Sequence, residues 1–548
     1  MELSILDYFV IVGYLLFVII MGSFFSKGDK STENYFLGGK SIKWLPLAIS
    51  MYTSIFSAIS FIMAPAEAFR GDLQYLVALI MFPIASVFAL VFFIDVYTRF
   101  NMTTIYEYVE ARFSRRLGYI VLSSFLLFRT IYAGIVVFTL SMILNVIMGF
   151  PLIETIVVVG IGAIVYTTLG GMKAVIWTDV VQFVAIIAGL VVVLFYASAQ
   201  VPGGFTEIVR LAGDENKLRL ANFDFDLTER YVFWTLIIYG LVEFLGAKTV
   251  DQMNVQRYLS AQSPRHAKIA MLMQSLFSIP VWLLLFAVGI SLYAFYQYNP
   301  SMEITGFVDN GLFDRIFPYY IATVLPSGIK GLLIAALMAA AMSTMDSVLN
   351  SLSAISVVNI YERIHPHSTP QRSLRMAKVF TIFWGIIIIG FAISMIDITS
   401  ILKTIQSISG IIMGPILGIF VLGLFTRHSN GKGVLIGLIF SLFPLIIMKY
   451  GVPIVLTLHA LFDTEATVPG CLVYLSKMTF TVYGVIGLSI SVLVGYWASK
   501  LFPTPSFQQI EPLLWRNRPW RSLLFGNPDE TIDINQLING TDENKKQQ

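Results

Sequence analysis

The stretch AAAMSTMDSVLNSL, residues 339–352, lies inside an otherwise apolar run that begins near Gly331. Its polar residues follow the i, i+3/i+4, i+7/i+8 spacing of a single helix face. The residues on that face are Ser343, Asp346, Ser347, Asn350 and Ser351. Polar groups at membrane depth are expensive unless they face a cavity or a partner. The stretch therefore predicts a membrane-depth helix whose polar face looks at something polar.

The composition of the chain is that of a membrane protein. Of its 548 residues, 57% are hydrophobic and only 13% are charged, and the mean hydropathy is +0.78. Apolar runs of about 20 residues recur, each long enough to cross a hydrocarbon core, and they lack the period of two of a β-barrel. We therefore predict an all-α integral membrane protein whose partner is the lipid bilayer.

Charge and cysteine content exclude other classes. The net charge is only +3, and the Lys and Arg residues lie mostly in short loops, so no nucleic-acid partner is expected. The single cysteine, Cys471, forbids an internal disulfide and offers no metal-site spacing. Nothing in the sequence predicts a particular oligomeric state.

Hydropathy predicts about thirteen transmembrane helices. The first is expected to be retained, because Glu2 and Asp7 stand where a signal peptide would be basic. The predicted spans are 5–25, 44–68, 74–98, 117–148, 151–169, 175–199, 230–256, 267–297, 317–358, 375–395, 399–425, 431–449 and 473–500.

Loop charge predicts the orientation of the chain. Every second loop is basic, and by the positive-inside rule those loops are cytoplasmic. This places the N-terminus outside and the C-terminus in the cytoplasm of a multi-pass protein of the cell (plasma) membrane. The loop at about 201–229 is then the longest external connection, and the polar tail after Phe502 is expected to be partly disordered.

Small hydroxyl residues interrupt the span 44–68. The segment SMYTSIFSAIS, residues 50–60, places Thr53, Ser57 and Ser60 near mid-membrane. Such residues either pack helices closely and bond to their own carbonyls, or mark a locally unwound segment whose carbonyl oxygens coordinate a cation. Both interpretations stay open at this point.

The opening stretch offers oxygen ligands of its own. The hydroxyls of Ser343 and Thr344 and a bent-helix carbonyl such as that of Ala340 could supply three of the oxygens that a hard cation prefers. An intramembrane carboxylate such as Asp346 needs a cation, a proton or a basic partner. A structural hydrogen bond is the alternative for Asp346.

Further ionisable residues lie at membrane depth. Asp179, in TTLGGMKAVIWTDVVQ (167–182), is either a salt-bridge or capping carboxylate or part of an ion site. Arg129 forks naturally onto an oxyanion, and Glu243 and Asp346 are equally possible partners for it. The remaining candidates are Lys248 and Gln406 with its neighbours Ser407 and Ser409.

Four motifs resemble those of the sodium/solute symporter family, to which the sodium/glucose cotransporters belong. They are TTLGGMKAVIWTDVVQ, DQMNVQRYLSA (251–261), AAAMSTMDSVLNS and GLFTRHSNGKG (423–433), in the order and spacing of that family. The resemblance runs from about residue 5 to residue 500.

The resemblance implies a leucine-transporter-like fold of two inverted five-helix repeats, in which 44–68 and 230–256 are the broken first helices. The expected division is 1–43 for an extra N-terminal helix and loop, 44–200 for the first repeat, 201–229 for an extracellular loop, 230–425 for the second repeat, 426–500 for additional C-terminal helices and 501–548 for a cytoplasmic tail.

By similarity to the family, sodium ion is the coupling ion. The principal site is expected to use backbone oxygens of Thr53, Phe56 and Ala340 with the hydroxyls of Ser343 and Thr344. Some relatives hold a second sodium at the positions of Asp179, Asp346 and Ser347. Many relatives have Ser or Thr in place of Asp346, so this carboxylate is expected to strengthen cation binding, to carry a proton, or to replace a cation by a salt bridge.

The resemblance also narrows the substrate. Gln406 matches a sugar-contacting glutamine, but most of the galactose-type pattern is absent. The segments FSAISFIMAPAEAFRG (56–71), YEYVEARF (106–113) and IYAGIVVF (131–138) look more like the branch for monocarboxylates, vitamins and iodide and like bacterial sialic acid symporters. The predicted substrate-binding residues are Ser57, Ser60, Arg129, Glu243, Lys248 and Gln406.

The predicted function is sodium-coupled symport of a small organic solute, an anion such as a monocarboxylate or an acidic sugar, by alternating access. The alternatives are a sodium-coupled carrier of neutral sugars or polyols and a proton-coupled carrier. A sensor would need an output domain, and a channel would need a continuous pore. No arrangement of nucleophile, base and oxyanion donors is visible, so an enzyme is not expected.

Overall fold

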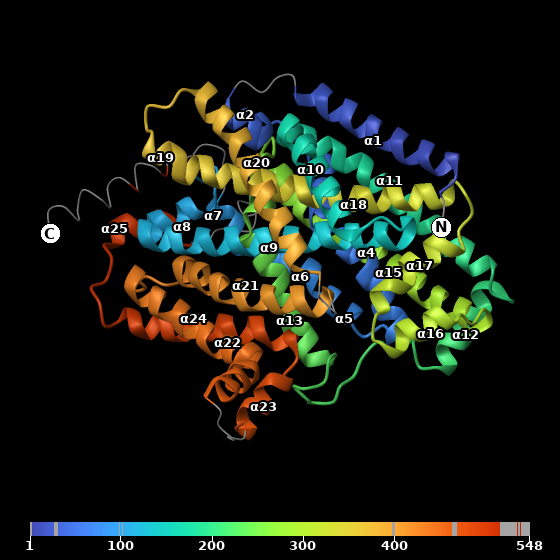
Figure 1. Cartoon of the computed structure of the whole chain (residues 1–548). Coiled ribbons are helices and arrows are strands. Elements are labelled where there is room, and N and C mark those ends of the chain that lie inside the picture. Colours follow the sequence, from blue (N-terminus) through green and yellow to red (C-terminus); the bar gives the residue numbers. More distant parts are fainter. Residues whose placement is uncertain are drawn as a thin grey trace. The chain divides into compact units, whose positions relative to one another are not determined.

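The computed structural model of the protein is built of helices (Figure 1). It describes residues 3–26, 31–97, 99–100, 102–396, 401–462 and 468–515, together with Ile534 and Ile538. Within these ranges no β-strand forms, and one isolated bridge joins Ile42 to Ala261. Helices dominate because a helix satisfies its backbone hydrogen-bonding groups within one segment, as the bilayer demands. The predicted all-α class is confirmed.

The chain divides into two compact units, each built from three segments of sequence. The first unit comprises Met1–Leu76, Arg129–Leu220 and Gln256–Leu402, and the second comprises Val77–Phe128, Ala221–Val255 and Lys403–Gln548. The predicted boundaries at 44–200 and 230–425 concern the order of helices along the chain rather than their compactness. That division stays a prediction.

In the first unit, α11 packs against α1, α3, α15 and α18, and α10 packs against α18 and α20. The helices of this unit are α1 (Ile5–Ser26), α2 (Thr32–Leu37), α3 (Trp44–Ile55), α4 (Ala58–Arg70), α10 (Leu152–Leu169), α11 (Met172–Ala199), α12 (Gly204–Asp214), α15 (Pro264–Tyr298), α16 (Met302–Asp309), α17 (Ile316–Thr323), α18 (Ile329–Ile355), α19 (Glu362–Ile364) and α20 (Pro370–Ser394). The boundary between the units falls within α9 (Arg115–Met148) and α14 (Gln252–Leu259).

In the second unit, α22 packs along α24, and α13 packs against α6 and α24. Its helices are α5 (Leu76–Leu79), α6 (Met81–Ala89), α7 (Asp95–Tyr97), α8 (Tyr106–Arg112), α13 (Phe233–Thr249), α21 (Ile401–Phe425), α22 (Gly431–Phe462), α23 (Gly470–Lys477), α24 (Tyr483–Ser499) and α25 (Phe507–Ile510). A Cβ at Gly414 would meet the carbonyl oxygen of Gly484 at 2.1 Å, so α21 and α24 approach closely because both positions lack side chains.

Two spans are broken where the sequence predicts it. The axes of α3 and α4 differ by 65°, and those of α13 and α14 differ by 52°. At the first break, Phe56 and Ser57 adopt extended backbone conformations, with ψ of 101° and 173°. Because α3 does not continue, carbonyl oxygens in its last turn lack the amide donors that a next turn would supply. These backbone carbonyls are therefore available to a ligand.

The predicted span 317–358 is wrong in its first part. The segment is split into α17 and α18 by VLPSG, where Pro326 stops α17 and Gly328 adopts a left-handed φ of +85°. Asp7 caps the new helix start, because its Oδ1 accepts hydrogen bonds from the amides of Gly328 and Gly331, both at 2.8 Å. This acidic residue thereby fastens α1 to the start of α18.

The predicted loop 201–229 contains the amphipathic helix α12 and a buried lysine. Lys217 donates to the carbonyls of Phe69 (2.7 Å) and Gly71 (3.1 Å), and its ammonium lies 3.8 Å from the ring centroid of Tyr293. Burial lowers the pKa of this ammonium. The loop is thus pinned to the C-terminal end of α4.

Part of the predicted C-terminal tail is ordered against the second unit. The hydroxyl of Tyr108 donates to the carbonyl of Leu513 at 3.1 Å, and the indole of Trp515 donates to the carbonyl of Val91 at 3.0 Å. Beyond Trp515, the expectation of disorder falls outside the described residues, apart from Ile534 and Ile538.

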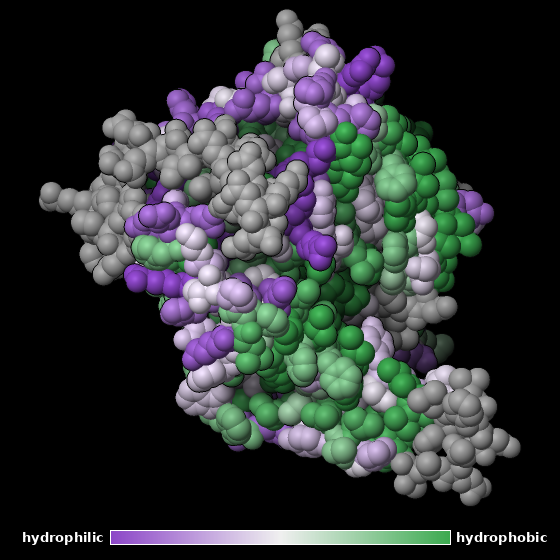
Figure 2. Space-filling model, turned by 90° about the vertical axis from the view of Figure 1, so that its left-hand side faces the viewer, coloured by the Kyte–Doolittle hydropathy of each residue, from purple (hydrophilic) through white to green (hydrophobic). Residues whose placement is uncertain are grey.

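The helix surfaces are those of a protein embedded in hydrocarbon. Hydrophobic residues cover broad areas of the molecular surface (Figure 2). The described residues contain ten helices long and apolar enough to cross a membrane, or up to twelve when each bent pair counts as one span, and Leu152–Thr168 is a shorter apolar helix. The predicted multi-pass architecture is therefore confirmed.

Candidate functional site

The predicted principal cation site lies in the first unit, at the break between α3 and α4. Thr53 and Phe56 are buried there, and the Thr53 hydroxyl donates to the carbonyl of Ile49 at 2.8 Å. Because the Thr53 hydroxyl is used in that bond, the backbone carbonyl of Thr53 is the group that it can offer to a ligand. The local sequence explains the break, since Ser57 begins α4 in an extended conformation without a side-chain cap.

Helix α18 faces this break with fully buried hydroxyls. The Thr344 Oγ1 donates to the carbonyl of Ser54 at 3.4 Å and to that of Ala340 at 3.2 Å. The Ser343 Oγ forms no hydrogen bond with the described part of the chain and is buried. A buried hydroxyl without a partner is costly, so its position at this break is the signature of a site for an oxygen-seeking ligand.

Beside this site lies a buried ion pair. The Arg257 Nη2 is 3.2 Å from the Asp179 Oδ2, and both side chains have no exposed surface. The Ser50 hydroxyl donates to the same carboxylate at 2.5 Å and accepts from Arg257 Nε at 2.9 Å. Arg257 Nη2 also donates to Ser347 Oγ. Asp179 therefore forms a buried salt bridge with Arg257, and its role in an ion site stays a prediction.

Asp346 occupies the neighbouring position on α18. Its Oδ1 accepts from the hydroxyl of Thr167 at 2.6 Å, and Tyr166 lies beside it. Its Oδ2 and the Asp179 Oδ1 are buried atoms without a hydrogen-bond partner among the described residues. The guanidinium of Arg257 thus pairs directly with Asp179 and acts on Asp346 through its charge, while Ser343 lies beside Asp179.

The polar face of α18 is largely satisfied by α14. The amide of Gln256 donates to the Asn350 Oδ1 at 3.2 Å, next to the contact of Arg257 with Ser347. The Ser347 hydroxyl donates back to the carbonyl of Ser343 at 2.6 Å. The motif DQMNVQRYLSA therefore supplies the polar partners that the opening stretch requires, except at Ser343 and Asp346.

Among the predicted substrate residues of the first unit, the structure connects Arg129 to the helix break. The Arg129 guanidinium is buried and lies 5.0 Å from the ring centroid of Tyr132. The Tyr132 hydroxyl donates to Ser57 Oγ at 3.4 Å. Ser60 lies one turn further along α4 and is half-buried. A cation and hydroxyls thus lie together beside the end of α3.

The other predicted substrate residues form side-chain bonds within the second unit. Glu243 accepts from Ser409 at 2.5 Å, and Gln406 accepts from the hydroxyl of Tyr239. These two bonds join α13 to α21. Lys248 is directed elsewhere, because its ammonium lies 4.0 Å from the ring centroid of Phe82 on α6.

Comparison with known proteins decides the family. The family model described as "Sodium:solute symporter family" matches residues 35–441. The chain belongs to this family. The symporter is also 30% identical over 510 residues to the sodium/sialic acid symporter SiaT of Proteus mirabilis, which covers 91% of this chain and 96% of that protein.

Two further comparisons agree. The sodium-coupled monocarboxylate transporter 2 of Mus musculus is 30% identical over 440 residues, covering 79% of this chain and 70% of that protein. A solved structure of a Na+-coupled sialic acid symporter, substrate-bound and outward-open, matches with a TM-score of 0.81 at 29% identity over 92% of this chain and 99% of that one. The predicted leucine-transporter-like fold and the prediction of a sodium-coupled secondary transporter rather than an enzyme are confirmed.

The residues of this symporter fit sodium chemically. Sodium prefers neutral or anionic oxygens, and the break offers backbone carbonyls, the Thr344 hydroxyl and the orphaned Ser343 hydroxyl. The nearby Asp346 Oδ2 adds a charged oxygen. These donors are all hard oxygen ligands of the kind that alkali and alkaline-earth cations select.

Two residues were missed as site residues by the sequence reasoning. Arg257 stands in the motif DQMNVQRYLSA, but neither composition nor spacing shows that its guanidinium is buried. Tyr132 lies in the noticed segment IYAGIVVF, but a tyrosine in an apolar helix carries no mark of its polar contact.

Proposed function

We propose that this symporter imports a small organic anion together with sodium. The observation that carries the proposal is the buried Arg129. Its guanidinium lies over the ring of Tyr132, and the hydroxyl of Tyr132 donates to Ser57 at the helix break. A guanidinium in that position is suited to a carboxylate. The sialic acid and monocarboxylate carriers among the relatives transport such anions, which supports the same substrate class.

The principal sodium site consists, in this proposal, of backbone oxygens of Thr53, Phe56 and Ala340 and the hydroxyls of Ser343 and Thr344. Sodium there links the end of α3 to α18, a connection that the bond from Thr344 to the Ser54 carbonyl already makes weakly. Sodium thereby favours the conformation in which the broken helix is ordered for substrate, which is a coupling free energy between the two ligands.

We further propose that Asp179, Asp346 and Ser347 hold a second sodium. Two carboxylates and one guanidinium leave a net charge of −1 in a buried cluster, which a monovalent cation neutralises. The Asp346 Oδ1 accepts from Thr167 at 2.6 Å, whereas its Oδ2 has no hydrogen-bond partner among the described residues and is available to a cation.

Replacing Asp346 by asparagine should lower the Hill coefficient of sodium-dependent uptake from about 2 toward about 1, because one cation site loses its charge. Uptake into proteoliposomes at a series of sodium concentrations measures the Hill coefficient. The series is run at pH 6 and at pH 8, about two units apart, so that the loss or gain of a proton would change the uptake. An unchanged Hill coefficient together with a lost pH dependence would show that Asp346 carries a proton instead.

The substrate contacts in this proposal are Ser57, Ser60 and Arg129 of the first unit. Replacing Arg129 by glutamine should raise the KM for an anionic substrate about 10- to 100-fold, the worth of a charged hydrogen bond. Uptake of sialic acid and of pyruvate under a sodium gradient provides the measurement.

The control for Arg129→Gln is a neutral analogue, the methyl ester of the same acid. Equal losses for the acid and its ester would mean that Arg129 supports the fold rather than the substrate charge. Tyr132→Phe keeps the ring beside Arg129 and removes only the hydroxyl that reaches Ser57, so it should cost less than Arg129→Gln.

The location proposed for the symporter is the plasma membrane, with the N-terminus outside and the C-terminus in the cytoplasm. The alternation of basic loops along the chain supports this orientation. In this orientation the sodium gradient of the cell drives the solute inward.

A further inference from the structure

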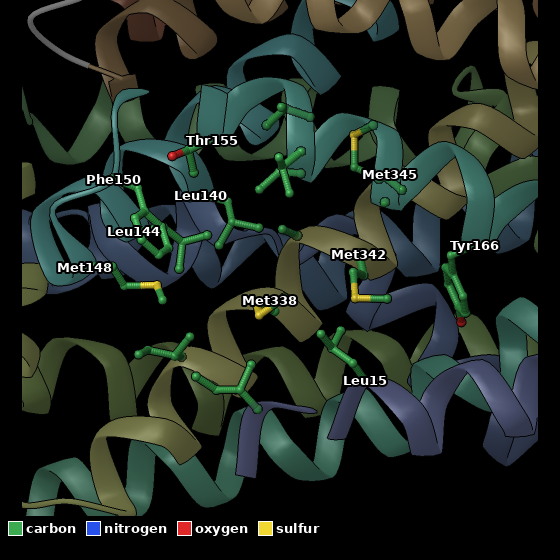
Figure 3. A pocket seen from close by; sticks show the side chains of 18 of the residues that line it. Leu15, Leu140, Leu144, Met148, Phe150, Thr155, Tyr166, Met338, Met342 and Met345 are labelled. Carbon is green, nitrogen blue, oxygen red and sulfur yellow. The ribbon is translucent and has the colours of Figure 1, made fainter. Parts of the chain in front are cut away.

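An apolar cavity of about 550 Å³ lies within the first unit, between α1, α9, α10 and α18. Figure 3 shows side chains of these helices around a common space, with Met148 and Phe150 toward one end and Tyr166 at the other. Its middle is lined by Leu15, Met338 and Met342. None of the sodium or substrate residues proposed above lines it.

The walls of the cavity are held in place by contacts outside it. The bonds from Gly328 and Gly331 to Asp7 fasten one end of α1 to α18. Near the other end of α1, a Cβ on Gly22 would stand 3.3 Å from the ring of Tyr166 on α10. On its far side α10 rests against α20, where Gly160 meets Ile389. These contacts fix the two ends of α1 against α18 and α10.

An apolar space that opens toward a bilayer is suited to hydrocarbon. Protein interiors are close-packed, and an apolar cavity does not hold water stably. The cavity is open to the surroundings of the helices, since Val158 on α10 is 69% exposed and Ile19 on α1 also lies at the surface while lining it. Because these are membrane-spanning helices, what reaches that opening is lipid.

The polarity of the cavity indicates an amphiphile. Because Gly22 and Tyr166 bring the ends of α1 and α10 together, the starts of these helices, at Tyr8 and Glu154, share the opposite end. Tyr8 and Glu154 are both exposed there, next to Phe150. Between them and Tyr166 the lining is apolar, apart from Thr155, whose hydroxyl is bonded to the Pro151 carbonyl.

We propose that this cavity binds one acyl chain of a membrane glycerophospholipid. The chain runs from Tyr8 and Glu154, where the headgroup stays outside, toward Met345 and Tyr166. Its volume lies in the range that proteins use for ligands of this size. Met338, Met342 and Met345 recur at i, i+4 and i+7 on one face of α18, and their flexible thioethers can follow chains of different shape.

Photocrosslinking in vesicles tests the proposal with the full-length protein. Vesicles of phosphatidylcholine contain a small fraction of phosphatidylcholine with a diazirine near the end of one acyl chain. After illumination and digestion, mass spectrometry maps the labelled peptides. Label on the α18 segment with Met342 and Met345 is expected, because both side chains line the cavity and Met345 contributes almost nothing to the outer surface.

The matched variants are Gly162→Leu and Gly13→Leu. Both glycines lie in apolar helices, and a Cβ at either meets nothing within 4 Å, so both substitutions should fold. Gly162 lines the cavity and Gly13 does not. Gly162→Leu should reduce the α18 label at least several-fold, whereas Gly13→Leu should leave it unchanged.

Three results would overturn the proposal. The first is that α18 of the parent protein carries no more label than the lipid-facing helices. The second is that α18 is labelled equally in Gly162→Leu and Gly13→Leu. The third is that Gly13→Leu also loses label relative to the parent protein. The thermal unfolding of each variant is measured alongside. Should Gly162→Leu unfold early, Gly162→Ala repeats the comparison with a smaller intrusion and a correspondingly smaller loss of label.

Discussion

Replacing Arg257 by glutamine should destabilise the symporter by about 3–5 kcal/mol, the cost of leaving a buried charge without its partner. The substitution leaves Asp179 uncompensated in a site with no exposed surface. It also removes the donors to Ser50 and Ser347. Unfolding of the detergent-purified protein, followed by heat and by denaturant, measures the loss.

Two further variants make the result specific. Arg257→Gln combined with Asp179→Asn should recover most of the lost stability, because no uncompensated charge remains. Arg265→Gln, at an exposed position at the start of α15, should change stability by less than about 0.5 kcal/mol. If Arg257→Gln is as stable as the parent at high and low sodium alike, the ion pair does not hold α14 against α11 and α18.

The double variant also connects this pair to transport. Because Asp179, Asp346 and Arg257 share one cluster, removing one positive and one negative charge leaves its net charge unchanged. We therefore expect the double variant to keep a sodium dependence closer to that of the parent than either single variant does. This comparison separates the charge of the cluster from its detailed geometry.

Replacing Ser343 by alanine should raise the sodium concentration for half-maximal uptake by about tenfold or more, since a ligand bond to a charged group is worth about 1.5–3 kcal/mol. The hydroxyl makes no hydrogen bond with the described residues, so its removal should cost little stability in the absence of sodium. Uptake kinetics and thermal unfolding at a series of sodium concentrations, with choline replacing sodium, measure both quantities.

The control for Ser343→Ala lies on the same helix. The Ser351 hydroxyl donates to the carbonyl of Ser347 at 2.8 Å, so Ser351→Ala removes a satisfied hydroxyl two turns away and should leave the sodium dependence unchanged. Thr344→Ser keeps a ligand hydroxyl and should behave like the parent, whereas Thr344→Val should resemble Ser343→Ala. An unaltered sodium dependence in both Ser343→Ala and Thr344→Val would refute the principal site.

Several features of this symporter follow from the sequence because they are local. The apolar runs predict the spans, and the small hydroxyl residues of SMYTSIFSAIS leave open a break, which the resemblance predicts and the structure places at Phe56 and Ser57. The spacing of the polar residues in 339–352 predicts one helix face. Even the error at 317–358 is local, because Pro326 and Gly328 are visible in the sequence and a hydropathy window averages over them.

What that polar face meets could be decided only by the tertiary structure. Asp179 and Arg257 are 78 residues apart in the chain, and packing of α14 against α11 and α18 brings them within 3.2 Å. The same holds for Tyr132 and Ser57, which lie 75 residues apart. A periodic pattern determines which side chains share a face, but their neighbours depend on how distant helices cross, and that is a property of the packed chain alone.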